Sequence, residues 1–205
     1  MRALLVALLV AGLGAAPALA QSTETALRQA REARSAGDLP RATKLVQGVL
    51  RREPLNYLAL YNMGLIAAAR AERAAPGPER ARHLRDAAQW LERARAQRAP
   101  QKIQDATIFN TLGTVYLQLG ELQKAEAALM EGKRNEAALS ATSRGQLYSS
   151  IGYLNALKGD TKAALPALEQ ASRLGNRTAA DNYERVKEQD AQMQMRQQAI
   201  PPRAP

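Results

Sequence analysis

A pattern of small residues recurs at fixed offsets along this chain, and no other feature constrains the fold as strongly. Twelve residues separate Gly113 from Ala125, and twelve also separate Gly152 from Ala164. Larger residues stand four positions and one position before each of these glycines and three positions after it, on one face of a helix. The pattern predicts pairs of helices joined by tight turns, in which small residues let the two helices approach closely. Because one such hairpin cannot bury its apolar face alone, neighbouring hairpins must stack.

Four copies of this pattern predict four helical hairpins, at residues 23–56, 57–101, 106–139 and 145–178. The first copy is degenerate, because it has Ala26, Gln29 and Ala33 where the other copies carry larger residues. The second copy has eleven extra residues between Gly64 and Ala87 and contains Pro76-Gly77-Pro78, which cannot be helical throughout. It therefore predicts two lengthened helices, at about 55–74 and 79–98. A further amphipathic helix over 179–198 is expected to cap the array, followed by a disordered tail over 199–205.

The third copy carries Phe109-x2-Leu112-Gly113-x2-Tyr116 and then Ala125-x3-Leu129, which resembles the tetratricopeptide repeat with its 34-residue period. The resemblance runs from about Thr23 to Thr178. It implies an all-α fold, a right-handed solenoid of about four helical-hairpin units, with a single domain over 21–198. Many unrelated proteins carry such repeats, so the resemblance implies a fold and a mode of binding but no particular process.

Residues suited to catalysis are scarce. Cysteine is absent and His83 is the only histidine, which excludes disulfides, a thiolate nucleophile and a multi-histidine metal site. The glycines fall at repeat positions and form no phosphate-binding loop, and the acidic residues are scattered on helix faces. We therefore expect no enzyme activity, no metal and no cofactor, and we interpret His83 as a solvated residue of the lengthened hairpin.

The first twenty residues have the features of a secretory signal. Arg2 precedes an apolar run from Ala3 to Leu13, and Ala18-Leu19-Ala20 forms a small-residue cleavage site before Gln21. The pattern predicts cleavage after Ala20 and a periplasmic or secreted mature protein. An uncleaved membrane anchor is the alternative, because the uncharged stretch of 18 residues is near the lower limit for spanning a bilayer.

The resemblance implies that the first helix of each hairpin lines a concave groove, in which another protein or a peptide binds. The residue types favour amide and aromatic contacts, with Tyr61 and Tyr153 as candidate anchors unless they pack against a neighbouring copy. The candidate groove residues are Arg31, Arg34, Tyr61, Asn110, Thr114, Gln118 and Tyr153, with Leu27, Leu58, Leu65, Leu117, Ser149 and Ala156 at equivalent positions.

Basic residues concentrate in the first half of the chain, within a formal net charge of +10. Residues 21–102 hold 16 Lys or Arg and 8 Asp or Glu, whereas residues 103–205 hold 12 and 11. The basic residues are candidates for a binding surface for an anionic partner, but an arginine-rich composition throughout the source proteome would explain the excess of basic residues equally well. The candidate basic patch comprises Arg70, Arg73, Arg80, Arg82 and Arg85.

Two functions from different classes follow from these features. The first is a non-enzymatic, exported scaffold or adaptor that binds a protein of the bacterial cell envelope in its groove. The second is a basic module that docks through the 70–102 hairpin to an anionic membrane surface or cell-envelope polymer. Nucleic acid is not expected as a partner, because no aromatic residues interleave with the arginines and export argues against it.

Overall fold

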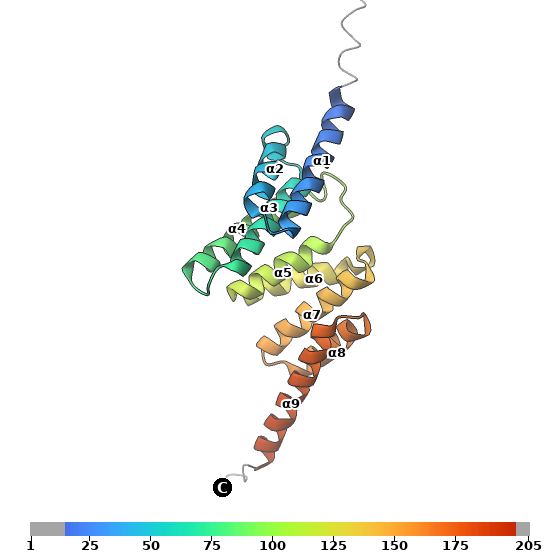
Figure 1. Ribbon diagram of the computed structural model, residues 1–205. Coiled ribbons are helices and arrows are strands. Elements are labelled where there is room, and N and C mark those ends of the chain that lie inside the picture. Colours follow the sequence, from blue (N-terminus) through green and yellow to red (C-terminus); the bar gives the residue numbers. More distant parts are fainter. Residues whose placement is uncertain (1–14, 200–205) are drawn as a thin grey trace, which may run out of the picture. The chain divides into compact units, whose positions relative to one another are not determined.

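The computed structural model describes residues 15–199, and within that range the chain is all-α (Figure 1). It divides into two compact units, the first ending at Lys102 and the second beginning at Ile103. Unit 1 contains α1 (Ala15–Ser35), α2 (Leu39–Arg52), α3 (Tyr57–Arg73) and α4 (Pro78–Ala96). Unit 2 contains α5 (Thr107–Leu119), α6 (Leu122–Arg134), a 3₁₀ turn (Glu136–Ala138), α7 (Ala141–Leu157), α8 (Thr161–Arg173) and α9 (Arg177–Ala199).

The helices pair as antiparallel hairpins, α1 with α2, α3 with α4, α5 with α6 and α7 with α8, as the repeat predicts. The α3–α4 hairpin is the lengthened one, and its exposed turn at Pro76–Gly77 separates helices of 17 and 19 residues.

Two helix boundaries differ from the boundaries that the sequence predicts. Helix α1 begins at Ala15, inside the predicted signal segment, and α7 begins at Ala141 because the Ser140 side chain caps it. Residues 1–14 and 200–205, which hold most of the signal segment and of the predicted tail, lie outside the described residues.

The turns are built as the sequence predicts, with a glycine in the left-handed region followed by an acidic residue. Gly37 has φ 83° and Gly159 has φ 76°, and a side chain at either position would be strained. The next residues, Asp38 and Asp160, accept hydrogen bonds from the backbone N–H three residues on, each at 3.0 Å. Glu121 in the third hairpin does not cap its helix and instead pairs with Lys124 at 2.7 Å.

A leucine of the second helix occupies the space that each repeat glycine leaves. A Cβ atom on Gly113 would lie 2.4 Å from Leu129 Cδ2, and one on Gly64 would lie 2.6 Å from Leu91 Cγ. Gly152 has the same relation to Leu168, also at 2.6 Å. The twelve-residue spacing from glycine to alanine thus marks the pair of helices, but the alanine does not make the closest contact. The leucine four residues after that alanine packs against the glycine.

Helix α9 closes the core of unit 2 and then continues past it. Ala179 and Val186 are buried against α8, and Tyr183 packs on the same cluster. Thr161, the first residue of α8, donates a hydrogen bond to Asp190 at 2.8 Å. Since α8 and α9 run antiparallel, residues 191–199 extend beyond the start of α8, and α9 projects from unit 2 in Figure 1.

Candidate functional site

The first helices of unit 2 lie next to one another, as a binding face built from first helices requires. Helix α5 contacts α7, and α7 contacts α9. Thr114 Oγ1 of α5 lies 3.5 Å from Ser150 Oγ of α7, and it also donates to the Asn110 backbone carbonyl at 2.9 Å. The predicted residues Asn110, Thr114 and Gln118 therefore share one side of α5. Asn110 Oδ1 is buried there without a hydrogen-bond partner among the described residues, whereas Gln118 is exposed.

A groove of about 200 Å³ opens between α7 and α9 at the end of this face. Leu168 and Val186, both buried, form its floor. The side chains of Tyr153 and Leu157 stand at its edge and are 43% and 48% exposed. Tyr153, predicted as an anchor, thus lies in a groove and is not covered by the neighbouring helix.

The α9 side of the groove is polar and cationic. Asn182, Arg185 and Gln189 line it from successive turns of the helix. Arg185 Nη2 donates to Asn182 Oδ1 at 2.7 Å, which holds the guanidinium along the helix. Among the described residues no carboxylate forms an ion pair with Arg185, although three acidic residues of α9 lie within about one helical turn of it. These are Asp181, Glu184 and Glu188.

In unit 1 the predicted groove residues differ in exposure, and Leu58 is 46% exposed. Tyr61 is half-buried and stacks on the buried Tyr57, with ring centroids 5.9 Å apart and an interplanar angle of 5°. Arg31 is exposed, whereas Arg34 is half-buried with its Nε atom enclosed. The expectation that Leu27 lines the groove is wrong, because Leu27 is 2% exposed and belongs to the core.

In unit 2, Leu117 was likewise expected on the groove and is instead buried. It follows Gly113 by one helical turn, so its side chain points to the same packed side of α5.

The candidate basic patch separates into two groups. Arg70 donates to Thr43 Oγ1 at 2.7 Å, and Arg73 donates to the Gly37 carbonyl at 2.8 Å, so both bind the neighbouring hairpin of unit 1. Arg82 and Arg85 are exposed on α4 without an ion pair to the described side chains, and Arg80 is half-buried.

His83 was expected to be solvated and is not. Its side chain is only 17% exposed, and Nε2 lies 3.7 Å from Glu79 Oε1. In the described part of the chain, no cluster of three or more His, Asp or Glu residues could hold a metal ion.

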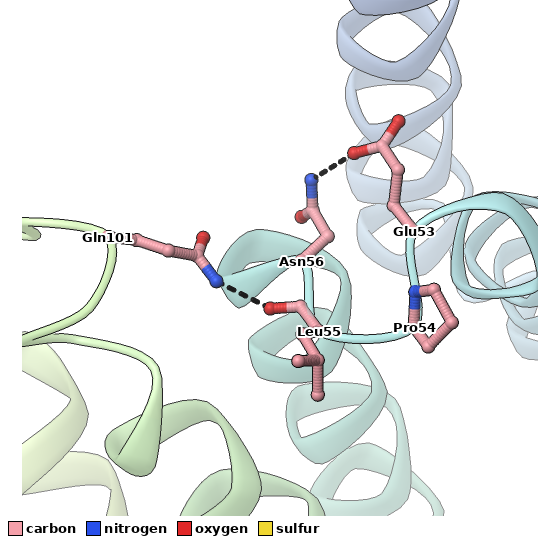
Figure 2. Close-up of a pocket in the computed structure, with 5 residues that line it drawn as sticks. All are labelled: Glu53, Pro54, Leu55, Asn56 and Gln101. Carbon is pink, nitrogen blue, oxygen red and sulfur yellow. Dashed lines mark hydrogen bonds between the residues drawn. The ribbon is translucent and has the colours of Figure 1, made fainter.

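A second hollow, of about 510 Å³, lies beside the α2–α3 loop of unit 1 (Figure 2). The polar groups around it are already paired. Glu53 Oε2 accepts from Asn56 at 2.7 Å, and Gln101 donates to the Leu55 carbonyl at 2.5 Å and accepts from the Tyr57 N–H at 3.3 Å. These bonds tie the end of unit 1 to the loop, so the hollow is a structural junction with no free polar group from this set to offer a ligand.

One ionisable group of unit 2 has a strongly shifted pKa. The Tyr148 hydroxyl donates to Glu136 Oε2 at 2.7 Å. This hydrogen bond, with burial and the negative charge of Glu136, raises the pKa of Tyr148 from 10.0 to about 12. The contact joins α7 to the 3₁₀ turn and has a structural role.

The sequence did not reveal the α9 side of the groove. The sequence pattern predicts only a capping role for α9, so it does not indicate Asn182 and Arg185 as binding residues. Arg185 follows Asn182 by three residues, and Gln189 follows Arg185 by four. This spacing places all three side chains on one side of a helix, which is the only indication of the site that the sequence contains. That this side faces Tyr153 follows only from the packing of α9 beside α7.

Solved structures share this architecture. A thermophilic TPR protein of Thermus thermophilus superposes with a TM-score of 0.64 at 20% identity, over 80% of this chain and 80% of that one. The fold is that of the tetratricopeptide repeat. Pseudomonas aeruginosa PilF superposes on this chain with a TM-score of 0.70 at 12% identity, over 85% of this chain and 72% of PilF. A MamA protein gives 0.57 at 17% identity, over 89% of this chain and all of MamA. No family model matches the sequence, and no curated protein matches it significantly.

Stacked helical-hairpin repeats generally bind other proteins or peptides. A concave groove that continues through all the repeats stays a prediction.

Proposed function

We propose that the protein is a non-enzymatic TPR scaffold or adaptor that binds another protein through its first-helix faces. One observation carries the proposal: the groove between α7 and α9 leaves Tyr153 and Leu157 exposed beside Arg185, which forms no ion pair with a described carboxylate. Large apolar side chains that remain open beside hydrogen-bond donors are typical of protein interaction sites. The fold supports this function in general.

Crosslinking in native extract tests the proposal. We expect a purified, photo-crosslinkable form of the full chain to capture a defined protein, identified by mass spectrometry. Tyr153→Ala should lower the capture at least tenfold if Tyr153 is an anchor, since anchors contribute about 2 kcal/mol or more. Arg173→Ala, on an exposed site of α8, serves as the matched control. Equal capture by the wild type and the Tyr153 variant contradicts the proposed site.

We propose further that this scaffold is exported and acts in the bacterial cell envelope. The support is the signal-like segment that ends at Ala20, together with the absence of cysteine. Within residues 15–199, no helix is both long and apolar enough to cross a membrane. N-terminal sequencing of the mature protein should begin at Gln21, and an intact Met1 in a cytoplasmic fraction would contradict export.

A second candidate function is docking to an anionic membrane or envelope polymer through α4. The observation that favours it is the exposure of Arg82 and Arg85 without ion pairs to described side chains, near Arg93, which lies over the Trp90 ring at 4.6 Å. Binding of this kind should weaken steeply with salt. Co-sedimentation with vesicles that contain an anionic lipid, at low and physiological ionic strength, with Arg82→Glu and Arg85→Glu as variants, separates it from the scaffold function.

A further inference from the structure

The groove between α7 and α9 has a size and lining that indicate what it binds. Its volume of about 200 Å³ is below the 300–1,000 Å³ of ordinary small-molecule sites. A space of this size receives one bulky side chain that belongs to a larger partner. The exposed apolar surface of Tyr153 and Leu157 at the edge, over a buried floor of Leu168 and Val186, suits an aliphatic or aromatic side chain.

The charge distribution indicates a second feature of the partner. The groove side of α9 offers the Arg185 guanidinium and the Gln189 amide, and none of the residues that line the groove is acidic. Helix α7 has no Asp or Glu anywhere between Ala141 and Leu157. Glu126 of the neighbouring α6 is already paired with Lys158 at 2.9 Å. A carboxylate brought to this rim therefore meets an arginine that forms no ion pair with a described carboxylate.

We propose that the α7–α9 groove binds a segment of a partner protein that carries a bulky apolar side chain close to a carboxylate. The apolar side chain enters between Tyr153 and Val186, and the carboxylate pairs with Arg185. Asn182 holds the guanidinium in place through its 2.7 Å hydrogen bond, so it is a positioning residue. This inference rests on the proposed scaffold function and names the chemistry of its partner.

Peptide arrays test the partner chemistry directly. The probes are nine-residue peptides in an alanine and serine background, with leucine, phenylalanine or alanine at the centre. A single glutamate, glutamine or lysine is placed at each other position in turn. We expect the full-length protein to bind the leucine and phenylalanine series, with the best glutamate peptide about tenfold tighter than its glutamine counterpart.

Variants connect this preference to the groove. Arg185→Gln should abolish the preference for glutamate and keep the preference for a large central residue, whereas Arg185→Lys should retain both in part. Tyr153→Ala should weaken binding of every peptide, and Arg173→Gln is the matched control because Arg173 is exposed and paired with Glu169. Circular dichroism checks that each variant is folded.

The outcomes separate the inference from the proposed function. Equal binding of glutamate, glutamine and lysine peptides, or a glutamate preference that survives in Arg185→Gln, overturns the inference. If Tyr153→Ala nevertheless loses the crosslinked partner, the scaffold function stands with a partner of other chemistry. If Tyr153→Ala loses neither peptides nor partner, both the inference and the proposed binding site between α7 and α9 are wrong.

Discussion

A missing Cβ atom sets the distance between the two helices in three of the hairpins. Gly64, Gly113 and Gly152 each face a leucine side chain that is fully buried. The leucine cannot move away without disturbing the core that surrounds it, because protein interiors are close-packed. These glycines are therefore packing residues, although helix propensity alone would favour alanine at each position.

Gly113→Ala should destabilise the protein by about 1–3 kcal/mol, because the new Cβ atom would lie 2.4 Å from Leu129 Cδ2. Chemical denaturation measures the change. Gly48→Ala is the control, since its Cβ would meet only Arg51 Nη2 at 3.8 Å, and it should stabilise α2 by up to about 1 kcal/mol. Equal effects of the two substitutions would show that the Gly113 contact is not tight.

Tyr148 gives a pH-dependent prediction. Its pKa is raised to about 12 in the folded protein, so the unfolded chain loses this proton first as the pH rises above 10.0. The stability contributed by the Tyr148–Glu136 hydrogen bond is thus fully present below pH 10 and is lost as the pH rises toward 12. The difference in unfolding free energy between the wild type and Tyr148→Phe should be constant below pH 10 and shrink above it. A difference that grows over this range contradicts the assignment.

At the scale of helices, two arginines join neighbouring hairpins of unit 1. Arg70 and Arg73 of α3 reach Thr43 of α2 and the turn at Gly37. A count of charges along the sequence placed both in a basic patch, because sequence does not show where a long side chain ends. Their guanidinium groups hold two hairpins together and are already engaged.

Arg70→Ala should lower the free energy of unfolding by about 1.5–3 kcal/mol through loss of a hydrogen bond from a charged donor. Thr43→Val removes the acceptor, and the double variant should cost less than the two single changes added together. Arg82→Ala, an exposed residue of α4 without a described partner, should change stability by no more than about 0.5 kcal/mol. Additive effects at Arg70 and Thr43 would mean that the 2.7 Å contact contributes nothing.

Local patterns in the sequence were enough to predict the helices, because Gly-x11-Ala offsets and Gly-Asp turns act within one hairpin. The degenerate first copy was harder to place. With alanine at positions 26 and 33, Leu27 takes the core position that a large repeat residue fills elsewhere, and it was therefore assigned to the wrong side of the helix. The groove partners Asn182 and Arg185 depend on how α9 packs against α7 and α8, which no local pattern encodes.

For the whole molecule, the segment between α4 and α5 is the boundary of the two compact units. Residues 99–102 are exposed and lie in turns, and Lys102 has φ 53°. Gln101 fastens this segment to Leu55 and Tyr57, which are 46 and 44 residues earlier in the chain. The boundary is thus open to solvent and yet tied to unit 1 by the Gln101 side chain.

Limited digestion with trypsin should cut first after Lys102 and give two fragments that meet there, because exposed turns are cleaved before helical arginines. Gln101→Ala should speed this cut by freeing the segment, and Lys102→Gln should abolish it. Mass spectrometry of the early fragments identifies the site. Earlier cleavage within α4 would contradict the compactness of unit 1.

The turn of the α3–α4 hairpin has a practical consequence for work in living cells. Gly77 has φ 148°, and a Cβ atom built on it would meet nothing within 4 Å. The flanking Pro76 and Pro78 are exposed, and neither lines the groove of unit 2. Surface turns of this kind accept added sequence at small energetic cost. A fluorescent reporter or an epitope tag can therefore be spliced in at Gly77 to follow the protein, which leaves both of its termini unaltered for whatever sorting machinery reads them.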